Sequence, residues 1–189
     1  MRSWMNFSLI NHGTPKRCDI NIDDYRMVVT PADVLSALQS PDAVTHARTC
    51  LVQQGWRVGS SEVTGHTVYL GQAGSRQRLR VYDKGLESGG EIPAVRWELE
   101  SKDEPAETLV PKLAADQWGP VIRRRLVSFV DFRDSSQAVA TEAKTRDRPR
   151  LAWFQMLVDL AEKATAYLPK PPRSINDVIS WVSGQVGTS

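Results

Sequence analysis

Hydrophobic and polar positions alternate strictly along residues 17–23, which predicts a β-strand with two unlike faces. The apolar face carries Cys18, Ile20 and Ile22, and the opposite face carries the acidic residues Asp19 and Asp23. Such a strand packs one face on a hydrophobic core and turns the other toward a polar environment. We therefore expect a sheet with an acidic, accessible side.

Two helical patterns follow this strand. Thr30 and Pro31 form a good helix start, because a threonine side chain can cap the first turn and proline suits the first helical position. The apolar stripe of residues 34–38 extends this helix. A second helix is predicted from Ala43 to near Gly55, where the glycine favours a C-terminal stop.

Three more strands are predicted in the middle of the chain. Residues 67–70 lead through a glycine-containing turn into residues 78–84, and residues 95–100 alternate again after a loop. Strands joined in this order by short connections are typical of an antiparallel meander.

From Pro105 the pattern becomes helical, with Pro111 as the expected kink. Residues 121–132 are strongly apolar but contain three consecutive arginines, and helix and strand are both compatible with that pattern. The predicted fold class is α+β, with an antiparallel β-sheet and packed helices followed by a C-terminal helical segment.

The polar stretch after residue 133 predicts a division of the chain. We expect residues 1–133 to form an α+β domain, residues 134–150 a linker, and residues 151–189 a helical segment. In that segment one helix is predicted over residues 151–168, and a second begins at Ser174 after a proline-rich break.

Composition narrows the class of protein. At 189 residues, with 41% hydrophobic and 24% charged residues, the chain has the make-up of a globular protein. Its apolar runs are far shorter than the roughly 20 residues of a membrane helix, and its start is a poor signal peptide. Cys18 and Cys50 are expected to be free thiols in a reducing compartment. We therefore predict a cytoplasmic protein with no membrane partner.

A candidate nucleophile lies in the strand predicted over residues 78–84. Tyr82 alternates with Arg78, Arg80 and Lys84, so the four side chains are expected on one face. A tyrosine attacks as something close to a phenolate, and nearby cations favour that form by lowering the pKa of the phenol. The same cations would hold a phosphate under attack.

Carboxylates on the predicted strands are candidate metal ligands. Glu98 and Glu100 share one strand face, and Asp19 and Asp23 form a second pair. Carboxylate oxygens bind hard divalent cations, and such a cation can polarise a phosphoryl oxygen. The simpler alternative is a half-solvated sheet whose arginines and glutamates pair across strands.

At these residues the chain resembles a known family. The blocks Tyr-Leu-Gly (residues 69–71), Arg-Val-Tyr-Asp-Lys (80–84) and Arg-Trp-Glu-Leu-Glu (96–100) are similar to those of the replication initiation factors of rolling-circle plasmids, filamentous phages and integrative conjugative elements. The acidic strand upstream, Val130-Asp131-Phe132-Arg133, Trp153-Phe154 and the closing Trp181, Gln185 and Val186 extend the resemblance over most of the chain.

The resemblance implies a sequence-specific, metal-dependent enzyme that nicks one DNA strand and rejoins it. Tyr82 would cut the origin and stay joined to the 5′ phosphate, leaving a 3′ hydroxyl for a host polymerase. Arg80 and Lys84 would bind the scissile phosphate. The divalent metal, Mg²⁺ or Mn²⁺, would be held by Glu98, Glu100, Asp19 and Asp23.

The expected partner is single- or double-stranded origin DNA, with a host helicase and a second copy of the chain as further candidates. A net charge of +2 does not by itself indicate a nucleic-acid binder, but clustered arginines can contact phosphates. The expected DNA-binding residues are Arg76, Arg78, Arg96, Arg123, Arg124 and Arg125. The alternative function is a non-catalytic DNA-binding regulator, or a truncated relative of the same fold.

The start of the chain motivates that alternative. The family resemblance implies a substantial segment before the acidic strand, whereas 16 residues precede residue 17 here. We expect either a fragment or a shortened relative whose sheet is completed by a second copy, because an open sheet edge favours pairing with another chain.

Overall fold

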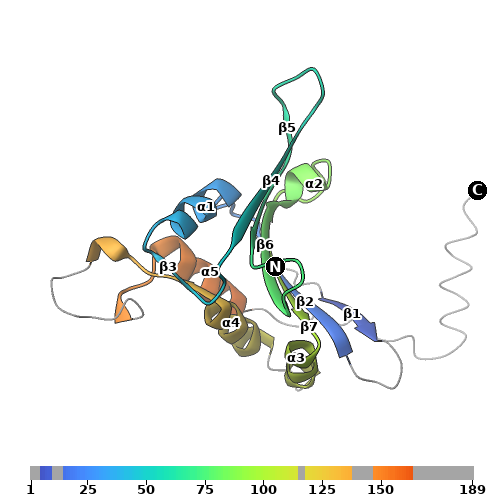
Figure 1. The fold of residues 1–189 in the computed structure, drawn as a ribbon, viewed down its shortest axis with the longest axis vertical. Helices are drawn as coiled ribbons and strands as arrows, with labels where there is room; N and C mark the ends of the chain where they lie inside the picture. Colours follow the sequence, from blue (N-terminus) through green and yellow to red (C-terminus); the bar gives the residue numbers. More distant parts are fainter. Residues whose placement is uncertain (1–4, 10–14, 115–117, 138–146, 164–189) are drawn as a thin grey trace, which may run out of the picture.

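The computed structural model of the 189-residue chain describes residues 5–9, 15–114, 118–137 and 147–163. Its centre is a six-stranded antiparallel sheet in the order β1-β2-β7-β6-β5-β4 (Figure 1). The strands are β1 (Met5–Leu9), β2 (Pro15–Asp24), β4 (Cys50–Trp56), β5 (Val63–Leu70), β6 (Gln77–Asp83) and β7 (Val95–Lys102). The predicted meander of three central strands and the α+β class are confirmed.

Four helices cover one face of this sheet: α1 (Pro31–Gln39), α3 (Glu104–Ala114), α4 (Trp118–Phe129) and α5 (Ala152–Glu162). The short helix α2 (Lys84–Glu87) follows β6 directly and contacts β5 and β7. A one-turn 3₁₀ helix, η1, spans Ser135–Gln137. The other face of the sheet carries none of the helices in the described part of the chain, apart from α2 at its end.

The helix start at Thr30 is confirmed in detail. The Thr30 side chain accepts a hydrogen bond from the Asp33 backbone, and the Asp33 carboxylate accepts one from the Thr30 backbone at 2.8 Å. This reciprocal arrangement is a capping box, which satisfies backbone donors that the helix leaves without partners. Helix α1 consequently begins at Pro31, as the sequence predicts.

The helix predicted from Ala43 to Gly55 is wrong. These residues form β3 (Ala43–Thr45) and most of β4. Leu51 and Val52, two apolar residues of this segment, are exposed on an edge strand. Long-range pairing of β4 with β5 outweighs the weak local preference for helix.

The segment of residues 121–132, whose pattern is compatible with both helix and strand, contains one of each. Helix α4 runs to Phe129, and β8 (Val130–Phe132) follows at once and pairs with β3. Pro111, the expected kink, lies inside α3.

The hydrophobic core lies between the helices and the apolar face of the sheet. Cys18, Ile20 and Ile22 point into it from β2, as the alternation predicts. Trp97 of β7 lies 6.2 Å from both Trp153 and Phe154, measured between ring centroids, so α5 packs in the same core.

The boundary expected at residues 134–150 stays a prediction, because residues 138–146 lie outside the described part. The helix predicted from Ser174 also lies outside it. Among the described helices, none is long and apolar enough to cross a membrane. Cys18 and Cys50 are free thiols, and burial raises the pKa of Cys18 to about 12.

Candidate active site on the polar face of the sheet

The face of the sheet opposite the helices, here called the polar face, collects charged side chains from three neighbouring strands. The antiparallel register places Tyr82 of β6 opposite Arg96 of β7, and Arg96 opposite Asp23 of β2. One step along, Arg80 of β6 lies opposite Glu98 of β7. The members of this face on β2, β6 and β7 are Arg17, Asp19, Asn21, Asp23, Arg78, Arg80, Tyr82, Arg96, Glu98 and Glu100.

Tyr82 is the candidate nucleophile, and its side chain is buried among its neighbours. It is only 7% exposed, and its hydroxyl donates a hydrogen bond of 3.4 Å to Oε2 of Glu98. The Arg80 guanidinium carbon is 5.2 Å and the Lys84 Nζ 5.9 Å from the centre of its ring. The structure thus brings together the tyrosine, both predicted cations and one predicted carboxylate.

The expectation that cations lower the pKa of Tyr82 is wrong in this arrangement. Burial raises the pKa of the phenol, and the negative charge of Glu98 raises it further. Arg96 and Arg80 act in the lowering direction, but they do not outweigh these two causes. Each of these arginines already faces a carboxylate, which reduces its effect on the phenol.

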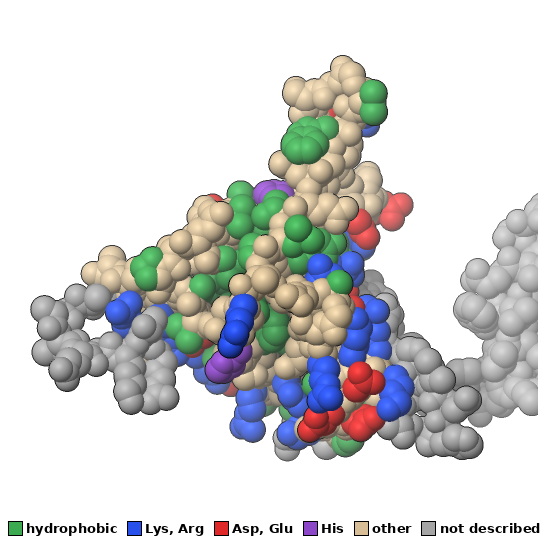
Figure 2. Space-filling view, viewed as in Figure 1, with side chains coloured by type: hydrophobic (Ala, Val, Ile, Leu, Met, Phe, Trp, Pro, Cys, Tyr) green, Lys and Arg blue, Asp and Glu red, His purple; other side chains and the backbone are tan. Residues whose placement is uncertain are grey.

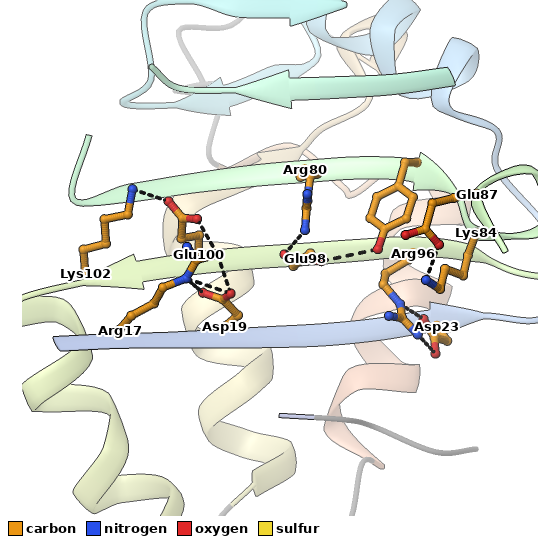
Figure 3. A network of polar contacts seen from close by, with 11 residues as sticks. Arg17, Asp19, Asp23, Arg80, Lys84, Glu87, Arg96, Glu98, Glu100 and Lys102 are labelled. Carbon is orange, nitrogen blue, oxygen red and sulfur yellow. Dashed lines mark hydrogen bonds and ion pairs between the residues drawn. The ribbon is translucent and has the colours of Figure 1, made fainter. Parts of the chain in front are cut away.

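The two cations next to Tyr82 have carboxylate partners of their own. Arg80 pairs with Glu98, and Lys84 pairs with Glu87 one turn further along α2 (Figure 3). Lys84, predicted as the last residue of the strand, is the first residue of the short helix α2. Asp83 caps this helix, because its carboxylate accepts a hydrogen bond of 2.9 Å from the Leu86 backbone N–H. The helix directs Lys84 back over the tyrosine ring.

Arg96 and Asp23 form a buried ion pair beside Tyr82. Two hydrogen bonds of 2.6 and 2.8 Å join the guanidinium to the carboxylate, and Asp23 is 2% exposed (Figure 3). Such a two-bond pair fixes the orientation of both groups. Arg96 was expected to bind DNA, but its charge is engaged within the sheet.

The remaining candidate metal ligands, Asp19 and Glu100, also form ion pairs with basic side chains. The Arg17 guanidinium lies 2.7 Å from both Asp19 and Glu100, and Lys102 lies 2.7 Å from Glu100 (Figure 3). Within the described residues, no three His, Cys, Asp or Glu side chains converge as a metal site would require. As they are arranged here, the four predicted carboxylates do not fit a divalent metal.

Arg78 differs from the other arginines of the polar face. Its guanidinium stacks over the Tyr69 ring, 4.0 Å from the ring centre, and its Nε has no hydrogen-bond partner among the described residues. It therefore carries a positive charge beside the site, and no carboxylate of the described residues forms an ion pair with it. Arg76, further out, is exposed and pairs with Glu104 at 3.1 Å.

The arginines of helix α4 lie on the other side of the sheet. Ile122 and Leu126 of the same helix are buried in the core, and the charge of Arg125 acts on Cys18, which points into that core. Arg123 pairs with Glu162 of α5 at 3.1 Å. The structure does not bring Arg123, Arg124 and Arg125 together with Tyr82.

A groove of about 320 Å³ leads to Tyr82 from the side of β4 and β5. Its lining includes Gln53, Gly55, Thr64, Gly65, Thr67, Tyr69, Arg80, Tyr82 and Glu87. The strand residues Thr67 and Tyr69 were not among the predicted site residues. Their alternation with the buried Val68 and Leu70 was the signal that could have placed them on the polar face.

Comparison with known proteins shows what this chain is similar to. A search of the solved structures matches the structure of a rolling circle replication initiator protein from Geobacillus stearothermophilus, with a TM-score of 0.70 and 21% identity. The match covers 82% of this chain and 59% of the other, so this chain spans a little over half of that relative. A search of curated proteins gives no match. Residues 13–189 match the family described as replication initiation factor, and the chain therefore belongs to that family.

Proposed function

We propose that the chain is a rolling-circle replication initiator that nicks and rejoins one strand of origin DNA through Tyr82. The observation that carries this proposal is the hydrogen bond from the Tyr82 hydroxyl to Glu98 at the end of an open groove. The Glu98 carboxylate is thereby next to the phenol proton that a base would have to take before Tyr82 attacks. Family membership and the shared fold support the initiator role.

The proposed chemistry is a transesterification. Glu98 accepts the phenol proton, and the Tyr82 oxygen attacks the phosphorus of the origin strand. The bond from phosphorus to the 3′ oxygen breaks, and that oxygen takes up a proton. The phosphodiester energy is kept in the phosphotyrosine, so the reverse reaction can rejoin the strand without a nucleotide cofactor.

The ion pair between Arg80 and Glu98 couples this proton transfer to phosphate binding. When Glu98 becomes protonated, it no longer balances the charge of Arg80. Arg80 is then free to stabilise the negative charge that grows on the phosphate oxygens. Arg78, whose Nε has no hydrogen-bond partner within the described part of the chain, would contact the neighbouring phosphate.

A divalent metal, Mg²⁺ or Mn²⁺, remains part of the proposal as a requirement to be tested. The carboxylates do not form a site in this structure, so no step is assigned to a metal. A host helicase and a second copy of the chain likewise stay proposed partners.

The test is a covalent adduct. Labelled single-stranded fragments that tile the replicon encoding this chain are incubated with the protein and Mn²⁺, and adducts are separated under denaturing conditions. We expect one fragment to give an adduct that is lost in Tyr82→Phe. Salt-sensitive binding to the same fragments without any adduct would instead support the non-catalytic DNA-binding regulator.

A further inference from the structure

Three cations lie close to Tyr82, and each of them forms an ion pair with a carboxylate of the chain. The pairs are Arg80–Glu98, Arg96–Asp23 and Lys84–Glu87. Before DNA binds, the charges of these cations are therefore balanced inside the protein. A phosphate forms a full ion pair with one of them only if the carboxylate moves away or becomes protonated.

The three carboxylates differ in how easily they can leave their cations. The side chains of Glu98 and Asp23 are 9% and 1% exposed, so each would stay buried and charged without its partner, which is costly. The Glu87 side chain is 53% exposed, although its partner Lys84 is only 15% exposed. Because Glu87 can turn into water, it is the carboxylate that a phosphate displaces at the lowest cost.

The helix that carries the Lys84–Glu87 pair is anchored by its backbone. The Lys84 N–H donates a hydrogen bond of 2.8 Å to the Ala94 carbonyl, just before β7. Beyond the helix, the Gly90 N–H donates one of 2.8 Å to the Gly85 carbonyl. Acidic side chains lie at the surface over α2 (Figures 1 and 2). Exchange of Glu87 for a phosphate would therefore need a rotation of its side chain and no movement of the helix.

Glu87 lies at the candidate site itself. It lines the groove that leads to Tyr82, and the Lys84 Nζ is 5.9 Å from the centre of the Tyr82 ring. Burial and then the charge of Glu98 raise the pKa of Tyr82, and the charge of Glu87 acts in the same direction. Figure 3 shows Lys84 and Glu87 joined at one end of the row of ion pairs on the polar face. The negative charge of Glu87 thus lies in the groove where the proposed function needs a phosphate.

We propose that Glu87 is a positioning residue, which holds Lys84 over Tyr82 in the free protein and is replaced there by a phosphate of the bound strand. The inference rests on the proposed function, since it takes Lys84 as a ligand of the scissile phosphate. No covalent bond changes in this exchange: the Glu87 side chain turns into solvent, and a phosphate oxygen takes its place at the ammonium group. Until then the carboxylate repels phosphate oxygens, so Glu87 lowers the affinity of the groove for a single strand.

The first test is the affinity for a strand of no particular sequence. Binding of the full chain to a labelled 15-nucleotide oligo(dT) is measured by fluorescence anisotropy at several salt concentrations. We expect Glu87→Gln to bind about 2- to 5-fold more tightly than the natural chain, which is the range for an exposed ion pair. The slope of the logarithm of affinity against the logarithm of salt concentration should steepen by about 0.7, the value for one further phosphate neutralised on a single strand.

Lys84→Gln distinguishes the exchange from simple repulsion by Glu87. If Glu87 acts by its charge alone, Glu87→Gln should strengthen binding by the same factor with and without Lys84. If Glu87 keeps Lys84 from the phosphate, most of that gain should be lost in the Lys84→Gln background, because no ammonium group is left to release. Equal gains in the two backgrounds would overturn the inference.

Glu91→Gln is the matched control for the loss of one negative charge. Glu91 is an exposed residue of the loop between α2 and β7, and it lies outside the lining of the groove. Its replacement should leave both the affinity for oligo(dT) and the salt dependence as they are in the natural chain. If Glu91→Gln strengthens binding as much as Glu87→Gln does, the effect is one of net charge and the inference is wrong.

Failure of this inference can be told apart from failure of the proposed function. The binding assay needs no cleavage, so the gain from Glu87→Gln should also appear in the Tyr82→Phe background. If no fragment forms an adduct but the gain depends on Lys84, the nicking proposal fails and the exchange stands. If the adduct forms and Glu87→Gln leaves the affinity for oligo(dT) unchanged, the inference fails alone.

Discussion

The Tyr82 hydroxyl donates a 3.4 Å hydrogen bond to one oxygen of the Glu98 carboxylate, and the other oxygen of that carboxylate pairs with Arg80. One buried group thus faces both the candidate nucleophile and the cation that we propose binds the phosphate. A tyrosine is protonated at neutral pH, and burial raises the pKa of Tyr82 further, so a base is needed before Tyr82 can attack. Glu98 is the carboxylate in contact with it.

Glu98→Gln is expected to slow adduct formation by about 10²- to 10⁴-fold at neutral pH, because an amide cannot take the phenol proton. The deficit should shrink as pH rises toward about 10, the ordinary pKa of tyrosine, where solvent hydroxide can deprotonate the phenol. The measurement is the single-turnover rate of adduct formation across that pH range. Faster adduct formation in Glu98→Gln would contradict the base assignment and show that Glu98 only raises the pKa of Tyr82.

The raised pKa of Tyr82 also predicts alkaline instability. Above about pH 10 the unfolded chain loses this proton more readily than the folded chain, so the free energy of unfolding falls as pH rises. Tyr82→Phe removes that contribution. We expect urea unfolding to show a smaller loss of stability between neutral and alkaline pH in Tyr82→Phe than in the natural chain. An identical loss would mean that Tyr82 ionises equally easily in both states.

The buried Arg96–Asp23 ion pair is expected to make the folded protein sensitive to the loss of either partner. Its side chains are 11% and 1% exposed, so Arg96→Met would leave a carboxylate buried without its cation. Such a loss costs about 3–5 kcal/mol of stability. The double substitution Arg96→Met/Asp23→Leu removes both charges and should cost less than the single one. Urea unfolding of the three proteins measures this, and a double substitution at least as costly as the single would refute it.

Alternation in the sequence was enough to predict the acidic residues of the polar face. Asp19 and Asp23 on β2, and Glu98 and Glu100 on β7, are where the period of two places them. The start of α1 could also be predicted from the sequence, because its capping box involves Thr30 and Asp33, which are only three residues apart.

Pairing across strands could not be predicted in the same way. Periodicity gives the face of a residue, whereas the partner depends on register. A slip of two residues would keep Arg80 on the polar face and move it from Glu98 to another residue of β7. The burial of Tyr82, and with it the direction of its pKa shift, depends on helix α2 and on this register. The edge strand β4 was missed because its pattern lacks a buried face.

Arg17 is expected to compete with a divalent metal. It lies between Asp19 and Glu100, the two carboxylates that face each other across β2 and β7. Arg17→Gln would remove the cation that these two carboxylates share and leave only Lys102 on Glu100, so Mn²⁺ should bind more tightly than to the natural chain. Calorimetric titration with Mn²⁺ in the Tyr82→Phe background measures this without DNA cleavage. Weaker or equal binding in Arg17→Gln would place any metal elsewhere.

The dependence of DNA cleavage on the Mn²⁺ concentration tests whether Glu98 and Glu100 are metal ligands. If Glu98 and Glu100 contribute ligands, Glu98→Gln/Glu100→Gln should raise the Mn²⁺ concentration needed for cleavage. An unchanged requirement would remove both residues from the candidate metal ligands.

Arg78 and Arg124 should differ in their effect on DNA, because they lie on opposite sides of the sheet. Arg78 stacks on Tyr69 beside the groove, and no described residue hydrogen-bonds to its Nε, whereas Arg124 lies on α4 behind the sheet. Arg78→Gln should weaken binding to single-stranded DNA and reduce the salt dependence by about one phosphate contact. Arg124→Gln removes the same charge and should leave both unchanged. Anisotropy titrations at several salt concentrations measure the two slopes, and equal losses in both variants would mean that the polar face is not where the strand binds.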